Sequence, residues 1–176
     1  TGDANAVVGI ANYTTGDQDF SAQLINIKQM NPDVIFAPGN FTESALLIKQ
    51  ARQLGIDIPF LGGDTWETPE FVEIGGEAVE GVVFSTFFAS EVPMTEMSKV
   101  FLEEYAKRND NEPAAVTALG FDAYLVIIDA IKRANSIDPV AIRDAIAATE
   151  GFEGAAGIIT LDENGDAVKS AVIKTV

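Results

Sequence analysis

Three apolar segments of this 176-residue chain are each followed directly by side chains that could contact a small ligand. In chain order these side chains are Asn40, Phe41, Asp64, Thr65, Trp66 and Phe87. They offer an amide, a carboxylate, a hydroxyl and aromatic rings, a set that suits a small polar or zwitterionic solute. Asp64 would receive a cationic group, and backbone N–H groups at a helix start would receive an anion.

The three apolar segments, at residues 34–37, 58–62 and 82–85, read as strands separated by helices. Strands in this order predict right-handed βαβ crossovers and a parallel sheet. Open parallel sheets bind ligands at the carboxyl ends of their strands, where the following loops meet. The alternative is that these are ordinary turn residues, and Asn40 in particular fits a helix cap with Glu43 reaching back to it.

Catalytic chemistry has few candidates in this composition. The chain contains no Cys and no His, which removes thiol catalysis, disulfides, Ser-His-Asp triads and the commonest transition-metal ligand. The acidic groups at 17–19 and 162–166 lack EF-hand spacing, and GFEGAAG at 151–157 lacks the dinucleotide-binding pattern. Asp122 and Asp129 lie on a long apolar helix and are expected to occupy its wetter stripe or to pair with a neighbour, and not to act as a carboxylate dyad. We expect no catalytic residue, no metal and no cofactor.

The charge balance narrows the class of partner. With 11 basic and 27 acidic residues the formal net charge is −16, so nucleic acid and anionic membrane surfaces are poor partners. No apolar run reaches the length of a membrane helix. No basic apolar leader opens the sequence, so we expect any export signal to have been removed or never to have existed.

The elements that must position these side chains alternate along the first half of the chain. We expect a strand at 6–11, a helix at 19–30 and a strand at 34–37. A helix from Asn40 to Gly55 follows the strand at 34–37, and a short helix at 69–74 follows the strand at 58–62.

The second half is mainly helical. One helix is expected to end near Arg108, and a second is expected at 114–134. A third begins at Asp138-Pro139, where the aspartate is the cap and the proline is the first helical residue. Residues 151–157 read as a glycine-rich connector. The strands 158–161 and 171–173 read as a hairpin joined through the Asn-Gly turn at 162–166.

Six runs of residues, taken in order, resemble a known family. They are PDVIF at 32–36 with Gly39, IKQARQLG at 48–55, PFLGG at 59–63, GEAVEGV at 76–82, GFDAY at 120–124 and GIITLDENGD at 157–166. This series is similar to the C-terminal half of the type I periplasmic substrate-binding proteins, specifically the branched-chain amino-acid receptors of ABC importers.

The resemblance implies a receptor that closes on its ligand like a clamp, without catalysis, and delivers it to a membrane permease. In such relatives an acidic residue after the strand matching 59–61 takes the ligand ammonium, and the matching position here is Asp64. The loop after the strand matching 34–37 often supplies an aromatic side contact. Asn40 stands there instead, with Phe41 next to it, which leaves polar amino acids, amides and other small solutes open.

The fold expected from the resemblance is an incomplete parallel-sheet βαβ lobe with a C-terminal hairpin. Residues 1–90 would form part of the C-terminal lobe, 91–156 would belong to the other lobe, and 157–176 would return to the first. Interlobe crossings are expected near 89–93 and 151–157. The preceding half of the receptor, with the groups that grip the ligand carboxylate, is absent, so uncovered edges favour self-association.

The function expected is therefore that of an extracytoplasmic solute-binding component, periplasmic or extracellular, with a cell-surface lipoprotein also compatible. Two rival classes stay open at this point. One is a ligand-sensing module of the same fold, and the other is a carboxylate-based α/β enzyme, which the missing phosphate loop and nucleophile elbow disfavour.

Overall fold

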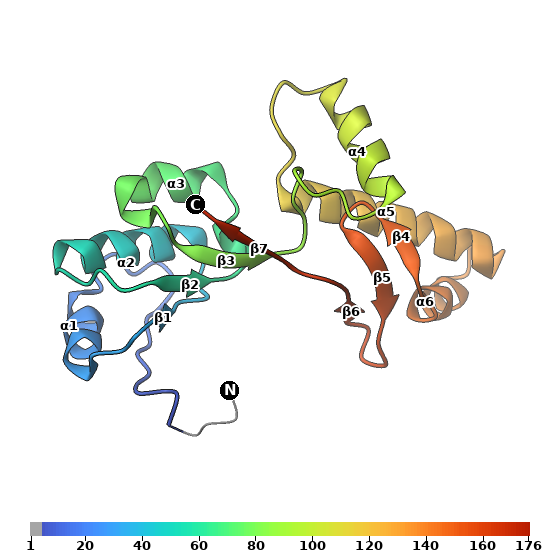
Figure 1. The fold of residues 1–176 in the computed structure, drawn as a ribbon. Helices are drawn as coiled ribbons and strands as arrows, with labels where there is room; N and C mark the ends of the chain where they lie inside the picture. Colours follow the sequence, from blue (N-terminus) through green and yellow to red (C-terminus); the bar gives the residue numbers. More distant parts are fainter. Residues whose placement is uncertain (1–4) are drawn as a thin grey trace. The chain divides into compact units, whose positions relative to one another are not determined.

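The computed structural model describes residues 5–176, which divide into two compact units (Figure 1). Unit 1 consists of the residues up to Ser85 together with Ile173–Val176, and unit 2 is Thr86–Val172. The division differs from the expected one, because residues 157–172 belong to unit 2 and only the last four residues return. The chain passes between the units at 85–86 and 172–173, and not near 89–93 and 151–157.

The sheet of unit 1 has the strand order β1-β2-β3-β7. Its strands are β1 (Ile35–Phe36), β2 (Phe60–Gly62), β3 (Val83–Thr86) and β7 (Val172–Thr175). β1 pairs with β2, and β2 with β3, both in parallel register, which confirms the parallel sheet expected from the sequence. The backbone of Val176 exchanges hydrogen bonds with Gly81 and Val82, so the end of β7 meets the start of β3 and these two strands run in opposite directions.

The helices of unit 1 lie close to the predicted positions. They are α1 (Ser21–Met30), α2 (Phe41–Gln53), the 3-10 turn η1 (Asp64–Trp66), α3 (Pro69–Gly75) and the 3-10 turn η2 (Gly76–Val79). Large side chains form the core between the helices and the sheet. Fully buried among them are Phe20, Leu24, Ile48, Phe60, Trp66, Phe71, Val79 and Val82. Unit 1 therefore contains a dense aliphatic and aromatic interior.

Two expectations for the start of unit 1 are wrong. Residues 6–11 form no strand, and Val7, Val8 and Ile10 are exposed, because no strand in the described part of the chain pairs with this segment. The run at 34–37 is not buried on both faces, since the side chain of Phe36 is 67% exposed. β1 is an edge strand, so one side of it lacks a neighbour among residues 5–176.

Unit 2 combines three helices with a small antiparallel sheet in the part of the chain described. Its elements are α4 (Glu96–Ala106), α5 (Ala115–Ala134), α6 (Pro139–Ala147), β4 (Phe152–Gly154), β5 (Gly157–Leu161) and β6 (Ala167–Val168). The side chain of Asp138 accepts hydrogen bonds from the N–H groups of Val140 and Ala141, which confirms the predicted cap. Within this part of the chain no helix has the length and apolarity that a bilayer crossing requires.

Two sequence expectations for the sheet of unit 2 need correction. The glycine-rich connector contains β4, which pairs with β5 and places Phe152 opposite Ile159. The hairpin turn at 162–166 forms, but β5 pairs with β6, and the chain then leaves to form β7 in the other sheet. Two backbone N–H groups inside the turn, those of Asn164 and Asp166, donate to the side chain of Asp162, which explains the tight register.

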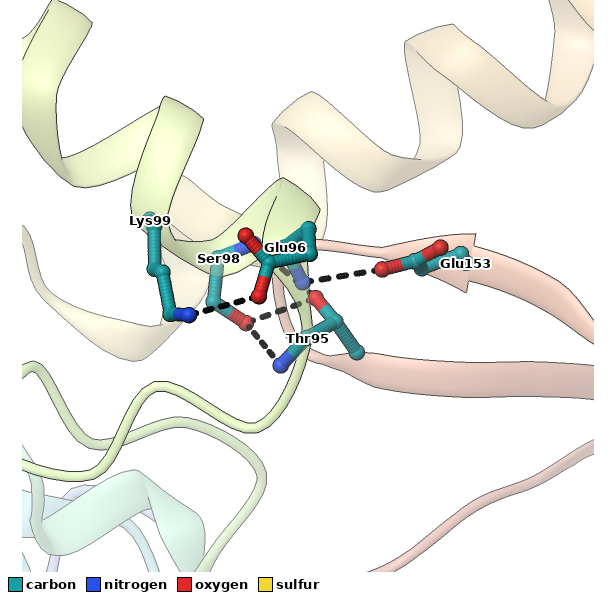
Figure 2. Close-up of polar contacts among 5 residues, drawn as sticks. All are labelled: Thr95, Glu96, Ser98, Lys99 and Glu153. Atoms are coloured by element: carbon teal, nitrogen blue, oxygen red, sulfur yellow. Dashed lines mark hydrogen bonds and ion pairs between the residues drawn. The ribbon is translucent and has the colours of Figure 1, made fainter.

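The start of α4 carries a network of short polar side chains (Figure 2). Thr95 and Ser98 form a capping box, in which each side chain accepts from the backbone N–H of the other. The carboxylate of Glu153 accepts from the N–H of Glu96 at 2.8 Å. Thr95 and Ser98 also donate to the carbonyl oxygens of Gly154 and Ala155, at 2.7 and 2.6 Å, so the helix start is tied to the β4–β5 turn.

Asp122 of α5 completes this network from the other side of the turn. Its side chain is 3% exposed, and its two oxygens accept from the N–H groups of Ala155 and Ala156 at 2.5 and 2.8 Å. Asp122 does not lie on a wetter stripe, so that part of the expectation is wrong. Asp129 is partly exposed and pairs with Arg133. We call Thr95, Ser98, Asp122 and the turn 154–157 the polar clamp of unit 2.

Candidate functional site

The loops that follow β1 and β2 meet at the edge of unit 1 where both strands end. Because the strands are parallel, with Phe36 opposite Leu61, their carboxyl ends lie at the same edge. The hydroxyl of Thr65 donates to the carbonyl oxygen of Gly39 at 2.7 Å, which joins the two loops directly. We call residues 38–41 and 63–66 the site loops.

Trp66 is the buried anchor of the second site loop. Its side chain is 1% exposed, and its ring stacks on Phe71 with centroids 5.0 Å apart and lies 6.5 Å from Phe84. A Cβ atom at Gly62 would lie 2.3 Å from this ring, so the glycine permits the tryptophan to lie against β2. The structure therefore places Trp66 in the core, where it positions its neighbours and presents no surface to a ligand in this conformation.

Asp64 and Thr65, the two residues before this anchor, are exposed. Asp64 begins η1, and within residues 5–176 its carboxylate makes no hydrogen bond or ion pair with another side chain. An exposed carboxylate without an internal partner can receive a cationic group of a ligand. Thr65 uses its hydroxyl hydrogen on Gly39, so its oxygen remains able to accept.

Asn40 and Phe41 stand at the start of α2. Asn40 occupies the cap position but its side chain makes no capping hydrogen bond, so the predicted cap and its return bond from Glu43 are wrong. The amide of Asn40 is exposed beside the other site loop. Phe41 is half-buried and packs against the core of unit 1, so only part of its ring faces outward.

Phe87 belongs to unit 2. The ammonium of Lys169 lies 5.3 Å from the centroid of its ring, a cation–π contact. Burial lowers the pKa of Lys169, and the nearby charge of Asp122 acts in the opposite direction. Of the six predicted residues, the structure thus brings five together in unit 1 and places the sixth in the other unit.

Tyr13 is a residue of this region that sequence reasoning missed. A Cβ atom at Gly39 would lie 1.7 Å from the hydroxyl oxygen of Tyr13. Burial raises the pKa of Tyr13, the negative charge of Glu43 raises it further, and the Ser44 hydroxyl acts in the opposite direction. No spacing in the sequence signals this contact, because 26 residues separate the two positions.

Two surface hollows lie elsewhere in the molecule. One is formed by residues 10–12 and α1, and the other by Asp129, Arg133 and residues 148–153. None of the six predicted residues lines either hollow. Among residues 5–176 no group of three acidic side chains is placed to hold a metal ion. The site loops offer exposed hydrogen-bonding groups and a carboxylate, which suit the binding of a polar solute.

Comparison with known proteins identifies the family of this chain. A family model described as "Periplasmic binding protein" matches residues 2–175. The leucine-, isoleucine-, valine-, threonine- and alanine-binding protein of Pseudomonas aeruginosa is 28% identical over 151 residues, which are 86% of this chain and 40% of that protein. A Leu/Ile/Val-binding protein homologue of Brucella abortus is 31% identical over the same shares.

Solved structures of proteins from the same family are also similar to this chain. The leucine-binding protein LivK of Thermotoga maritima has 49% sequence identity and a TM-score of 0.89 over 93% of this chain and 47% of its own. The LivJ protein of Streptococcus pneumoniae, solved in complex with isoleucine, has 32% identity and a TM-score of 0.82 over the same shares. The chain spans less than half the length of these relatives. The resemblance to branched-chain amino-acid receptors is confirmed, and the chain belongs to the periplasmic binding protein family.

Proposed function

We propose that this chain is part of an extracytoplasmic receptor that binds an α-amino acid, with Asp64 receiving the ligand's ammonium group. The observation that supports this most directly is the junction of the two site loops. The Thr65–Gly39 hydrogen bond holds the loops together, and Asp64, the residue before Thr65, is exposed and has no side-chain partner among residues 5–176.

The relatives' names support an amino acid as the ligand, and one of their structures holds isoleucine. Asn40 adds an exposed polar group on the other site loop, so the proposal covers both aliphatic and polar amino acids. Release to an ABC permease, a periplasmic or extracellular location and binding by clamp closure complete the proposal. The family is a solute-binding one, and the site loops contain no nucleophile–base pair.

The test is an amide-resonance NMR titration of the 176-residue chain with L-leucine, L-isoleucine, L-threonine and L-glutamine. We expect saturable shifts at residues 40, 64 and 65 with at least one of these ligands. Asp64→Asn should weaken that binding by about tenfold or more, the worth of a charge-assisted hydrogen bond.

Asp57→Asn is the matched control for this substitution. Asp57 is also exposed, and it lies before the start of β2, at the opposite end of the strand from Asp64. Binding in this variant should equal that of the unaltered chain. Equal binding by Asp64→Asn, or shifts confined to other parts of the chain, would contradict the proposal.

The open edge of β1 and the exposed Phe36 also support self-association of this chain, opposed by its net charge of −16. Sedimentation velocity at rising salt concentration tests this, since salt screens the repulsion. We expect the average mass to rise with salt and with protein concentration, and to do so less for Phe36→Lys. A compact monomer under all conditions would contradict it.

A further inference from the structure

Gly39 lies between two side chains that come from distant parts of unit 1. On one side the hydroxyl of Thr65 donates to its carbonyl oxygen. On the other side the phenol of Tyr13 lies over its α-carbon, because an added Cβ atom would be 1.7 Å from Oη and 3.0 Å from Cζ. Gly39 does not have a positive φ, so its lack of a side chain provides space for this contact and is not required by the backbone conformation.

Tyr13 is held in place by a segment that α2 anchors at two points. The N–H of Gly16 donates to the carboxylate of Glu43 at 2.8 Å, and the side chain of Glu43 is only 6% exposed. Gln50 accepts from the N–H of Phe20 and donates to the carbonyl oxygen of residue 18, both at 2.8 Å. We call residues 13–20 the strap.

The ring of Tyr13 is supported from within the strap as well. It packs edge-on against Phe20, with ring centroids 5.4 Å apart, and Phe20 is fully buried. A turn hydrogen bond from the N–H of Asp17 to the carbonyl oxygen of Thr14 keeps the strap compact. The strap is therefore held by α2, and the Tyr13 ring is held over Gly39 by its edge-on contact with Phe20.

We infer that Tyr13 is a positioning residue for the first site loop. Its contact with Gly39 sets where the loop lies, and this places the Gly39 carbonyl within reach of Thr65. Tyr13 acts through Gly39 and is not assigned a ligand contact. The consequence for binding rests on the proposed function, whereas the consequence for the position of the loop does not.

The test introduces the steric conflict and then removes it. Gly39→Ala places a methyl group against the Tyr13 phenol, so the loop must shift. We expect the amide resonances of Asn40 and Thr65 to move, and leucine binding to weaken by about tenfold, as for the loss of one hydrogen bond. In the double variant Tyr13→Ala/Gly39→Ala the Tyr13 phenol is gone and only Ser44 Oγ, 3.2 Å from the added methyl carbon, must yield by a few tenths of an ångström, so part of both properties should be restored.

Gly120→Ala is the matched control, since this glycine lies in α5, outside the site loops, its φ is not positive, and a Cβ atom there meets nothing within 4 Å. It should leave the Asn40 resonance and leucine binding unchanged. If Gly39→Ala leaves both amides in place, or if removing Tyr13 gives no rescue of resonances or of folding, the inference is wrong. If the amides respond as expected but the unaltered chain binds no amino acid, the proposed function fails and the positioning role stands.

Discussion

The two units of this protein are organised by different kinds of interaction. Unit 1 is built on large apolar side chains, with Trp66 stacked on Phe71 at its centre. Unit 2 has a smaller aromatic cluster around Phe101, and its β4–β5 turn is fixed by the polar clamp, of which Figure 2 shows Thr95 and Ser98. Apolar packing depends on volume, and a clamp of this kind depends on each donor and acceptor keeping its partner.

The two units also differ in the interactions that position their loops. In unit 1 a buried ring holds η1, so that Asp64 and Thr65 turn outward. In unit 2 three side chains hold a turn whose residues are themselves buried. The apolar interior of unit 1 should tolerate a change of polarity at its surface. The polar clamp of unit 2 should be sensitive to the loss of a single hydrogen bond.

The largest effect is expected for Trp66→Ala in unit 1. Removal of a fully buried aromatic side chain costs about 3–5 kcal/mol, and it also frees η1 from the core. Urea unfolding monitored by circular dichroism measures this loss. Phe36→Ala is the control, because this exposed side chain should change the free energy of unfolding by no more than about 0.5 kcal/mol. Similar losses for the two variants would contradict the account of unit 1.

A smaller but more local effect is expected for Asp122→Asn in unit 2. The amide keeps one acceptor oxygen and turns a donor group toward the second backbone N–H, so one buried N–H loses its partner at a cost of about 1–3 kcal/mol. Hydrogen exchange should accelerate at Ala155 and Ala156. Asp129→Asn removes only a partly exposed ion pair and should leave both amides protected. Unchanged exchange in Asp122→Asn would mean that the carboxylate does not hold the turn.

Thr95→Ala tests the helix end of the same clamp. It removes the capping oxygen for Ser98 and the donor to Gly154, for an expected loss of about 1–2 kcal/mol. The loss of unfolding free energy in the double variant Thr95→Ala/Asp122→Asn should differ from the sum of the losses in the two single variants, because both side chains hold one turn. Strict additivity would indicate that the two ends of the clamp are independent.

The smallest effect is a pH dependence that belongs to Asp122 alone. Burial raises its pKa, while the two N–H groups and Lys169 act in the opposite direction. A carboxyl whose pKa is higher in the folded state contributes stability that is fully present below the unfolded value of 3.8 and is lost as pH rises through the folded value. The difference in unfolding free energy between the unaltered chain and Asp122→Asn should therefore fall as pH rises from 3.8. A difference that grows with pH would mean that folding lowers the pKa of Asp122 and does not raise it.

Much of the fold could be predicted because its signals are local. The turn at Asp162 and the Asp138-Pro139 helix start are written in adjacent residues, and helical spacing located α2 and α5. The strand expected at 6–11 did not form because a strand requires a neighbour, which an apolar run cannot supply by itself. β4 was missed because its glycines resemble a connector.

The meeting of the two candidate site loops was predictable from the sequence, but the packing of their side chains was not. Parallel strands bring their following loops together whatever the sequence of those loops, so the edge carrying Asp64 followed from the strand order. The inward turn of Trp66 depends on Phe71 and Phe84, and the role of Asp122 depends on a turn more than 30 residues away. The Tyr13–Gly39 contact likewise joins segments that no local pattern connects.

The most direct measurement of the central claim compares two ligands that differ only at the group that Asp64 is proposed to hold. L-Leucine carries an ammonium, and its 2-oxo analogue, 4-methyl-2-oxopentanoate, carries a carbonyl in the same place. Dissociation constants from NMR titration should favour leucine by about tenfold or more in the unaltered chain, and Asp64→Asn should bind both ligands with nearly equal affinity. A preference for leucine that survives in Asp64→Asn would show that another group holds the ammonium.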